Sequence, residues 1–196
     1  MRTVRPYGPN AFLVEAESTD EVFALAALRV PGVIQVIPGA RSLLVECADL
    51  AAARQTFATC DVSSAIAGQD NTTIQVEVVY DGADLDEVAR ASGLRVDEVV
   101  ALHSGAEYTV ALCGFVPGFA YIAGLPTELH VPRRSSPRER VRAGSVAIAG
   151  EWTGVYPRAT PGGWHLLGST SMAMWDVERD PPALLAPGDR VRFRAV

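Results

Sequence analysis

The sequence predicts an α+β protein of two domains, a small α+β domain over residues 1–80 and a mostly-β barrel domain over residues 81–196. In the first part, strand-like and helix-like segments follow the order β-α-β-β-α-β, which is the order of a ferredoxin-like open-faced sandwich. From Glu107 onward, short hydrophobic segments are separated by glycine- and proline-rich turns. This spacing is typical of a closed or nearly closed β-barrel.

The elements of the first domain follow from local patterns. A strand is expected over residues 11–16, and Ser18 with Glu21 forms a capping box that opens a helix through VFALAAL. Two strands over 33–37 and 42–46 are joined by a turn-rich link, and a second helix covers 48–58. A strand over 73–79 completes the set, although a domain boundary within 61–72 is an equal alternative.

The second domain is expected to begin with two short helices. The first starts at Asp84 and ends near Gly93, and the second covers residues 96–102. Acidic side chains outnumber basic ones in this pair, so a packed helical lid is favoured over a DNA-reading motif. Barrel strands are expected at YTVALC, SVAIAG, TGVYP, WHLLG, SMAMWDV and RVRFRAV.

Composition excludes several classes of protein. The chain is 48% hydrophobic and 20% charged, as is typical of a globular protein. It contains neither the run of roughly 20 apolar residues that spans a membrane nor the apolar core of a signal peptide. Cytoplasm is therefore the expected location. The net charge of −6 argues against general nucleic-acid or membrane-surface binding. All 17 basic residues are arginine. A Walker A lysine and a Schiff-base lysine are therefore impossible in this chain.

Metal and nucleophile motifs are missing from the sequence. Its three cysteines and three histidines are scattered without CxxC or HExxH spacing, so no metal ligand set is expected. There is no GxSxG motif. His103, at the end of the second short helix, is the single candidate for acid–base catalysis, with helix capping as the alternative.

The segment CGFVPGFAYIAGLP, residues 113–126, combines rings with turn-forming residues. Glycine and proline fix the path of such a segment and so fix the direction of its rings. Phe119 and Tyr121 are therefore candidates for the wall of a ligand site. A structural loop that closes one end of the barrel is the alternative.

Two further segments supply candidate ligand contacts. In VPRRSSPRERVRAG, Arg133 and Arg138 each follow a proline, and their guanidinium groups suit a carboxylate or phosphate. A solvated basic edge or a partner surface is the alternative. In the segment 150–168, the amides of two adjacent glycines suit an anion nest and three rings suit an apolar pocket; these residues are Gly162, Gly163, Tyr156, Trp164 and Trp152.

Taken together, these segments resemble the family of allophanate hydrolase subunit 1, the B-type subunit of 5-oxoprolinase and the kinase inhibitor KipI. The resemblance covers essentially the whole chain and rests most strongly on GFVPGFAY and PGGW. It implies a C-terminal carboxyltransferase-type, cyclophilin-like barrel. It places the candidate substrate contacts at motif positions, namely Phe119, Tyr121, Arg133, Arg138, Tyr156, Gly162, Gly163 and Trp164.

The resemblance also implies partners and an activity. Such a subunit is expected to act with a homologous subunit 2 of the C-type or KipA-like kind, and with a third lactam-utilisation-type subunit, in ATP-dependent hydrolysis of a lactam or amide. ATP is expected at the level of the complex. The chain departs from the family pattern at Trp152 and Ser169, which predicts altered specificity or a regulatory role. Inhibition of sensor histidine kinase autophosphorylation, as by KipI, is the alternative function.

Overall fold

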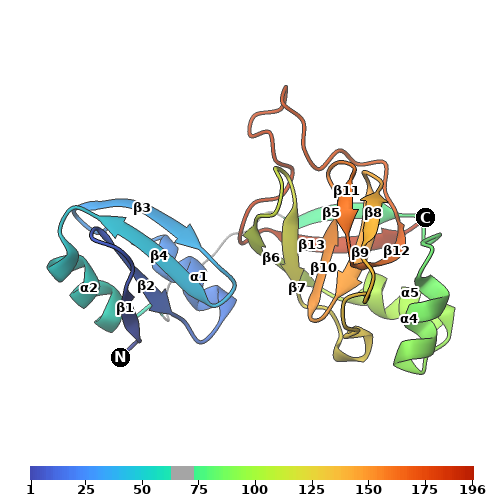
Figure 1. Cartoon of the computed structure of the whole chain (residues 1–196), viewed down its shortest axis with the longest axis horizontal. Helices are drawn as coiled ribbons and strands as arrows, with labels where there is room; N and C mark the ends of the chain where they lie inside the picture. The colour runs from blue at the N-terminus through green and yellow to red at the C-terminus, as the bar shows by residue number, and fades with distance from the viewer. Residues whose placement is uncertain (63–72) are drawn as a thin grey trace. The chain divides into compact units, whose positions relative to one another are not determined.

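The computed structural model describes residues 1–62 and 73–196, and it divides the chain into two units, Met1–Asp70 and Asn71–Val196. Each unit is built around a hydrophobic core of its own, and Figure 1 shows the elements of both. Within the described ranges, none of the helices has the length and hydropathy needed to span a bilayer.

Unit 1 is a four-stranded antiparallel sheet with two helices packed on it. The strands stand in the order β1-β2-β4-β3, and α1 packs on β3 and β4 while α2 packs on β1 and β2. Alternate residues of β2 and β4 point toward the helices, so Phe12, Val14, Leu43 and Val45 are fully buried there. The bounds are β1 Val4–Pro6, β2 Ala11–Glu15, α1 Thr19–Ala26, β3 Val33–Pro38, β4 Ser42–Cys47 and α2 Leu50–Thr59.

The predicted helix start at Ser18 is confirmed. The Ser18 hydroxyl accepts a hydrogen bond from the Glu21 amide at 3.2 Å and so satisfies one of the first amides of α1. The Glu21 carboxylate accepts from the amide of Glu17 at 2.7 Å. The reciprocal bond of the capping box therefore reaches one residue further back than the standard pattern.

The last strand of the expected ferredoxin-like unit lies elsewhere, so that part of the prediction is wrong. β5 (Thr73–Val78) pairs in parallel with β13 (Arg190–Ala195) in unit 2, over the full length of both strands. In unit 1 the position beside β2 is taken by β1, which the sequence did not predict. A short connection leads from β1 back along β2, and Pro6 can be accommodated because β1 is an edge strand.

Unit 2 is a nearly closed barrel of mixed strands. Its main sheet has the order β12-β9-β10-β7-β6-β13-β5, and β8 pairs with β11 in a separate ribbon. The remaining bounds are β6 Tyr108–Cys113, β7 Ala120–Ala123, β8 Arg138–Val141, β9 Ser145–Ala149, β10 Trp152–Val155, β11 Thr160–Gly162 and β12 His165–Ser169. A short 3₁₀ helix, η1, covers Thr127–Leu129.

The two outer strands of this sheet meet at a bridge between Val79 and Ser169. Their backbones exchange hydrogen bonds of 2.9 and 2.8 Å. A Cβ on Gly168 would lie 2.3 Å from the Val79 carbonyl oxygen, so a residue without a side chain is needed where the sheet closes. The seven strands therefore form an almost continuous wall around the core.

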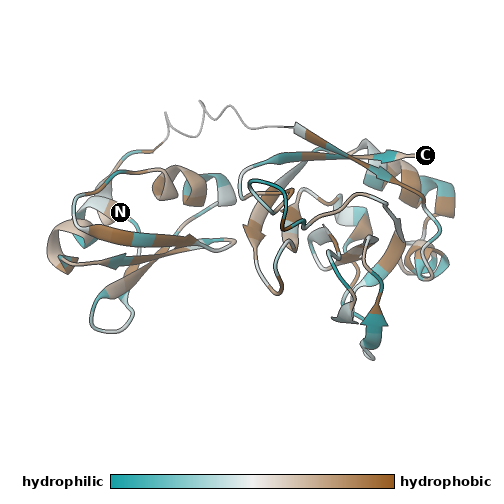
Figure 2. Cartoon of the chain, turned by 90° about the horizontal axis from the view of Figure 1, so that it is seen from above, coloured by the Kyte–Doolittle hydropathy of each residue, from teal (hydrophilic) through white to brown (hydrophobic). Residues whose placement is uncertain are grey.

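The helices α4 (Leu85–Ser92) and α5 (Val96–Gly105) pack on this barrel as expected for a lid. Gly93 ends α4 in the left-handed conformation, with a φ of 68°. α5 contacts β13, whose arginines alternate with hydrophobic residues (Figure 2). The buried side of β13 supplies Val191 and Phe193 to the core.

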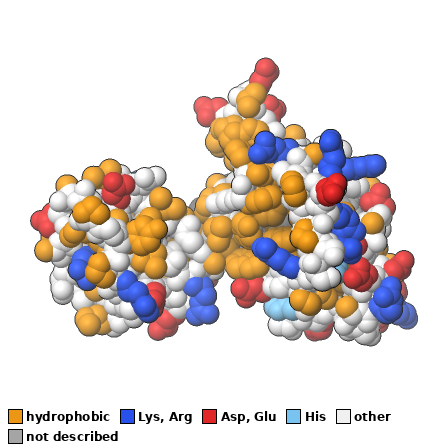
Figure 3. Space-filling model, in the orientation of Figure 1, with side chains coloured by type: hydrophobic (Ala, Val, Ile, Leu, Met, Phe, Trp, Pro, Cys, Tyr) orange, Lys and Arg blue, Asp and Glu red, His pale blue; other side chains and the backbone are white. Residues whose placement is uncertain are grey.

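Two stretches differ from the predicted pattern. The described residues 171–177 do not form the expected strand. They belong to the segment between β12 and β13, which projects from the barrel in Figure 1. Within this segment Trp175 and Ala183 form an isolated β-bridge. The segment 113–126 contains β7, so it is a hairpin rather than a simple loop. At its tip Phe115 has a φ of 68° and is 59% exposed. Figure 3 shows hydrophobic side chains gathered below the projecting segment.

Candidate functional site

Five aromatic rings from β7, β10 and the residues next to β7, β10 and β12 lie together on one face of the barrel sheet. We call this set, Phe119, Tyr121, Trp152, Tyr156 and Trp164, the aromatic group. Phe119 is at its centre, with ring centroids 5.1 Å from Tyr121 and 5.4 Å from both Tyr156 and Trp164, all in edge-to-face geometry. Phe119, Tyr156 and Trp164 are buried, whereas Tyr121 and Trp152 are half-buried. The half-buried rings are therefore the ones that can meet a ligand.

The alternation of β9 explains why the rings gather on this face. Val146 and Ile148 point into the main core of the barrel, while Ala147 and Ala149 point toward the aromatic group. The small alanine side chains leave room above the sheet for large rings. The aromatic group is thus a second, smaller core on the opposite face of the same strands.

The hydroxyl of Tyr156 is held at the edge of the aromatic group. It accepts a hydrogen bond from the Trp164 amide, and a Cβ on Gly162 would lie only 2.3 Å from the hydroxyl oxygen. Burial raises the pKa of Tyr156, and the bond from Trp164 and the charge of Arg133 offset this in part. Gly162 is therefore required by the close approach of Tyr156. Neither Gly162 nor Gly163 has a positive φ, so the expected anion nest of their amides is not formed.

Arg138 is held by a buried carboxylate that the sequence did not single out. Asp84 is 2% exposed, and its Oδ1 accepts from Arg138 Nη2 at 2.7 Å and from Arg134 Nη1 at 2.9 Å. Its Oδ2 accepts from the Leu166 amide at 2.7 Å. Burial alone would raise the pKa of Asp84, but the bonds from Arg138 and Leu166 outweigh burial and lower it. The carboxylate is thus ionised at neutral pH.

The two predicted arginines have different environments. Arg138 is partly buried and lies across the β8–β11 ribbon from Gly162, whereas Arg133 is exposed. The positive charges of both act on the Tyr156 hydroxyl. The structure therefore brings Arg133, Arg138, Gly162 and the aromatic group into one region. Arg134 turns to Asp84 and to Glu87, at 2.9 Å from each.

His103 lies in the core and apart from this region. It has no exposed surface; its Nδ1 is 2.7 Å from the Tyr80 hydroxyl and its Nε2 is 2.9 Å from Thr153 Oγ1. The Thr153 hydroxyl donates to the Ala147 carbonyl, so Nε2 of His103 donates to Thr153 and Nδ1 accepts from Tyr80. Burial lowers the pKa of His103 to about 3. We therefore interpret it as a neutral structural histidine and leave it out of the candidate site.

One group of side chains has the composition of a metal site. Single ligand atoms of Asp84, Glu87 and His165 lie within 4.8 Å of one another. The guanidinium of Arg134, however, bonds to both carboxylates and supplies the positive charge between them. We therefore assign no metal ion to this group.

Sequence reasoning missed Asp84 and Arg134 as members of the site. In the sequence, Asp84 has the position of an ordinary helix N-cap. Its partners Arg134, Arg138 and Leu166 are 50, 54 and 82 residues away. No local pattern reports such a contact. The sequence offers one indirect signal: residues 133–142 include five arginines and a single acid, Glu139, which favours pairing of these arginines with carboxylates from elsewhere in the chain.

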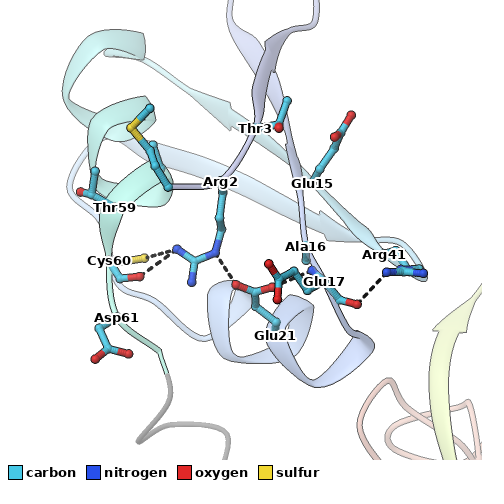
Figure 4. A pocket seen from close by; sticks show the side chains of 12 residues that line it. Arg2, Thr3, Glu15, Ala16, Glu17, Glu21, Arg41, Thr59, Cys60 and Asp61 are labelled. Atoms are coloured by element: carbon cyan, nitrogen blue, oxygen red, sulfur yellow. Dashed lines mark hydrogen bonds and ion pairs between the residues drawn. The ribbon is translucent and has the colours of Figure 1, made fainter.

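Unit 1 contains a cavity of about 650 Å³, seen from close by in Figure 4. The charged side chains at its rim bind the protein itself. Arg2 pairs with Glu21 and donates to the Cys60 carbonyl at 2.8 Å, and Arg41 donates to the Glu17 carbonyl at 2.8 Å. The bonds of Arg2 fasten the residues before β1 to α1 and to the end of α2, and the bond of Arg41 holds the residue before the N-cap of α1. We interpret this region as structural.

Residues 2–185 match the family described as carboxyltransferase domain, subdomain C and D. The chain belongs to this family. It is 43% identical to the B-type subunit of 5-oxoprolinase from Escherichia coli O157:H7 over 98% of this chain and 96% of that protein. It is 46% identical to the corresponding 5-oxoprolinase subunit from Bacillus subtilis over 61% of this chain, which spans 51% of that relative.

Among solved structures, the crystal structure of TTHA0988 is similar with a TM-score of 0.76 and 35% identity. The match covers 96% of this chain and 40% of that chain. The family membership suggested by GFVPGFAY and PGGW is therefore confirmed. The matches with the Escherichia coli protein and with TTHA0988 both include the two units, so the family relationship is not limited to the barrel.

Proposed function

We propose that this chain is the B-type subunit of a heteromeric, ATP-dependent hydrolase that opens a C–N bond in a lactam or amide. Among the named classes, 5-oxoprolinase is favoured over allophanate hydrolase. The observation that carries the proposal is the 43% identity to a B-type 5-oxoprolinase subunit over 98% of this chain. The match also covers 96% of that relative, so the two proteins do not differ by a whole domain.

The candidate site supports a ligand with a carboxylate on a small ring. Arg138 and Arg133 supply positive charge, and a guanidinium binds a carboxylate through paired hydrogen bonds. The exposed sides of Tyr121 and Trp152 supply apolar contact beside that charge. We propose that 5-oxoproline, which is a lactam bearing one carboxylate, lies against Tyr121 with its carboxylate toward Arg138.

The complete reaction requires other chains. The chain contains no lysine, so any lysine that contacts the phosphates of ATP must come from a partner. We propose that the partners are a homologous C-type subunit 2 and a third lactam-utilisation-type subunit, with ATP bound at the level of the complex. We also assign the barrel to the cyclophilin-like class and place the complex in the cytoplasm.

Reconstitution tests this proposal directly. The chain is purified alone and together with its subunit 2 and the third subunit, and ATP hydrolysis is measured with and without 5-oxoproline. We expect 5-oxoproline-dependent hydrolysis only when all three subunits are present. Omission of this chain is the control, and a complete complex without such activity would contradict the proposal.

Two variants connect the activity to the site. Arg138→Gln should raise the KM for 5-oxoproline because it removes the charged partner of the carboxylate. Arg140→Gln is the matched control, since this neighbouring arginine is exposed and makes no ion pair among the described residues. If the chain instead lowers autophosphorylation of a sensor histidine kinase and supports no hydrolysis, the KipI-like function replaces this one.

A further inference from the structure

Asp84 stands at the start of α4 but does not cap that helix. Aspartate at such a position ordinarily accepts a hydrogen bond from one of the first helical amides. Here the Asp84 side chain makes no capping bond, and all three of its bonds go to Arg134, Arg138 and the Leu166 amide. The carboxylate is thus used to hold other parts of the barrel.

The two arginines are not fully satisfied by this arrangement. Arg138 Nη1 and Arg134 Nε are buried atoms without a hydrogen-bond partner among the described residues. A buried N–H of a charged group that lacks an acceptor is costly, so such atoms indicate where a further acceptor binds. Asp84 neutralises Arg138 through Nη2 and leaves Nη1 free.

The free guanidinium nitrogen belongs to the arginine that adjoins the aromatic group. Arg138 lies opposite Gly162 in the β8–β11 ribbon, and its charge acts on the hydroxyl of Tyr156. Its ion-pair partner in the described part of the chain is Asp84, whereas Arg134 is shared between Asp84 and Glu87. The orientation of Arg138 therefore depends on Asp84 more than that of Arg134 does.

We propose that Asp84 is a positioning residue that fixes Arg138 through Nη2 so that Nη1 binds the carboxylate of the substrate. This inference rests on the proposed function and adds a determinant of substrate specificity to it. Asp84 does not touch the substrate. It acts by removing the rotational freedom of Arg138 before binding, which lowers the cost of forming the carboxylate contact.

The test compares Asp84→Asn with Glu87→Gln in the reconstituted complex. Asp84→Asn should raise the KM for 5-oxoproline about tenfold with a much smaller change in kcat, a factor that corresponds to about 1.4 kcal/mol. Glu87→Gln is the control: Glu87 pairs with Arg134 and not with Arg138, so KM should stay within about twofold. Discrimination supplies the second readout. The ratio of kcat/KM for 5-oxoproline over 2-pyrrolidinone, which lacks the carboxylate, should fall about tenfold in Asp84→Asn.

One further variant keeps the outcome decisive. If Asp84→Asn does not fold, Asp84→Glu takes its place, because it keeps the charge but displaces the carboxylate and should also raise KM. An unchanged KM and an unchanged discrimination in Asp84→Asn, or an equal rise of KM in Glu87→Gln, would overturn the inference. Inactivity of the unmodified complex would instead overturn the proposed function.

Discussion

Replacement of Gly162 by alanine tests whether Tyr156 occupies the place described above. The new Cβ would lie 2.3 Å from the Tyr156 hydroxyl oxygen, 2.8 Å from Cζ and 3.0 Å from Cε1. Ordinary contacts of this kind are about 3.5–4.0 Å, so the ring or β11 must move by about 1 Å. The ring cannot move freely, because Phe119 packs 5.4 Å away and the Trp164 amide binds the hydroxyl.

The expected cost is about 2–3 kcal/mol. Overpacking of a dense site costs about 1–3 kcal/mol, and the lost hydrogen bond adds about 1 kcal/mol, while the stiffer unfolded chain returns about 0.5 kcal/mol. Urea unfolding followed by tryptophan fluorescence measures this cost for unit 2, because Trp152, Trp164 and Trp175 all lie in that unit.

The adjacent glycine provides a matched control. A Cβ on Gly163 would lie no closer than 3.6 Å to any atom, so Gly163→Ala should change the free energy of unfolding by less than about 0.5 kcal/mol. Adding Tyr156→Phe to Gly162→Ala should recover part of the loss, because it removes the nearest atom. Equal costs for the two alanine variants, or no recovery in the double variant, would refute the proposed contact.

Three further predictions concern the core, unit 1 and the aromatic group. Burial lowers the pKa of His103 from 6.5 to about 3. Between these two pH values His103 is therefore protonated in the unfolded chain and neutral in the folded chain. The free energy of unfolding of unit 2 should therefore fall by roughly 1 kcal/mol per pH unit below pH 6.5, and His103→Gln should remove this slope in urea melts. Arg2→Ala should destabilise unit 1 by about 1–3 kcal/mol, since the pair of Arg2 with Glu21 is mostly buried. Arg5→Ala is the control: it breaks an exposed pair with Glu15 and should cost less than about 0.5 kcal/mol. Hydrogen exchange of the unit 1 amides measures both costs. Tyr121→Phe keeps the ring that contacts the ligand, so it should leave kcat/KM within about twofold and change the free energy of unfolding by less than about 0.5 kcal/mol. A tenfold fall in kcat/KM would contradict a purely apolar contact, and a loss of stability of several kcal/mol would identify Tyr121 as a structural ring.

The helices were predictable because their signals are local. Ser18 and Glu21 lie three residues apart, and Gly93 follows directly on the helix that it ends. Such signals depend on hydrogen bonds within one or two turns, which the sequence contains in full. The predicted strand over 171–177 is wrong because a strand depends on a distant partner. Alternation of hydrophobic residues does not supply a neighbouring strand with which to pair.

The placement of β5 could not be derived in this way. Its hydrophobic pattern predicts a strand, but the choice of sheet depends on a partner at the other end of the chain. Glu77 pairs with Arg194, 117 residues further on. β1 was missed for the complementary reason: the segment contains arginine and proline, and it becomes a strand because the edge of β2 is available to it.

In the candidate site, too, residues with a local sequence signal were predicted, and a residue whose role depends on distant contacts was not. The aromatic residues and Arg138 were identifiable because rings, glycines and proline-flanked arginines are unusual wherever they occur. Asp84 was not, because its chemistry becomes unusual only when it is buried beside two arginines from a segment 50 residues away. A carboxylate in that position must be ionised and fully bonded, since an unpaired buried charge would cost several kcal/mol. The stability of this part of the barrel and the orientation of Arg138 are therefore set by the same three hydrogen bonds, and a substitution at Asp84 affects both. A change in discrimination against 2-pyrrolidinone separates the two effects, because loss of folded protein lowers both activities by the same factor.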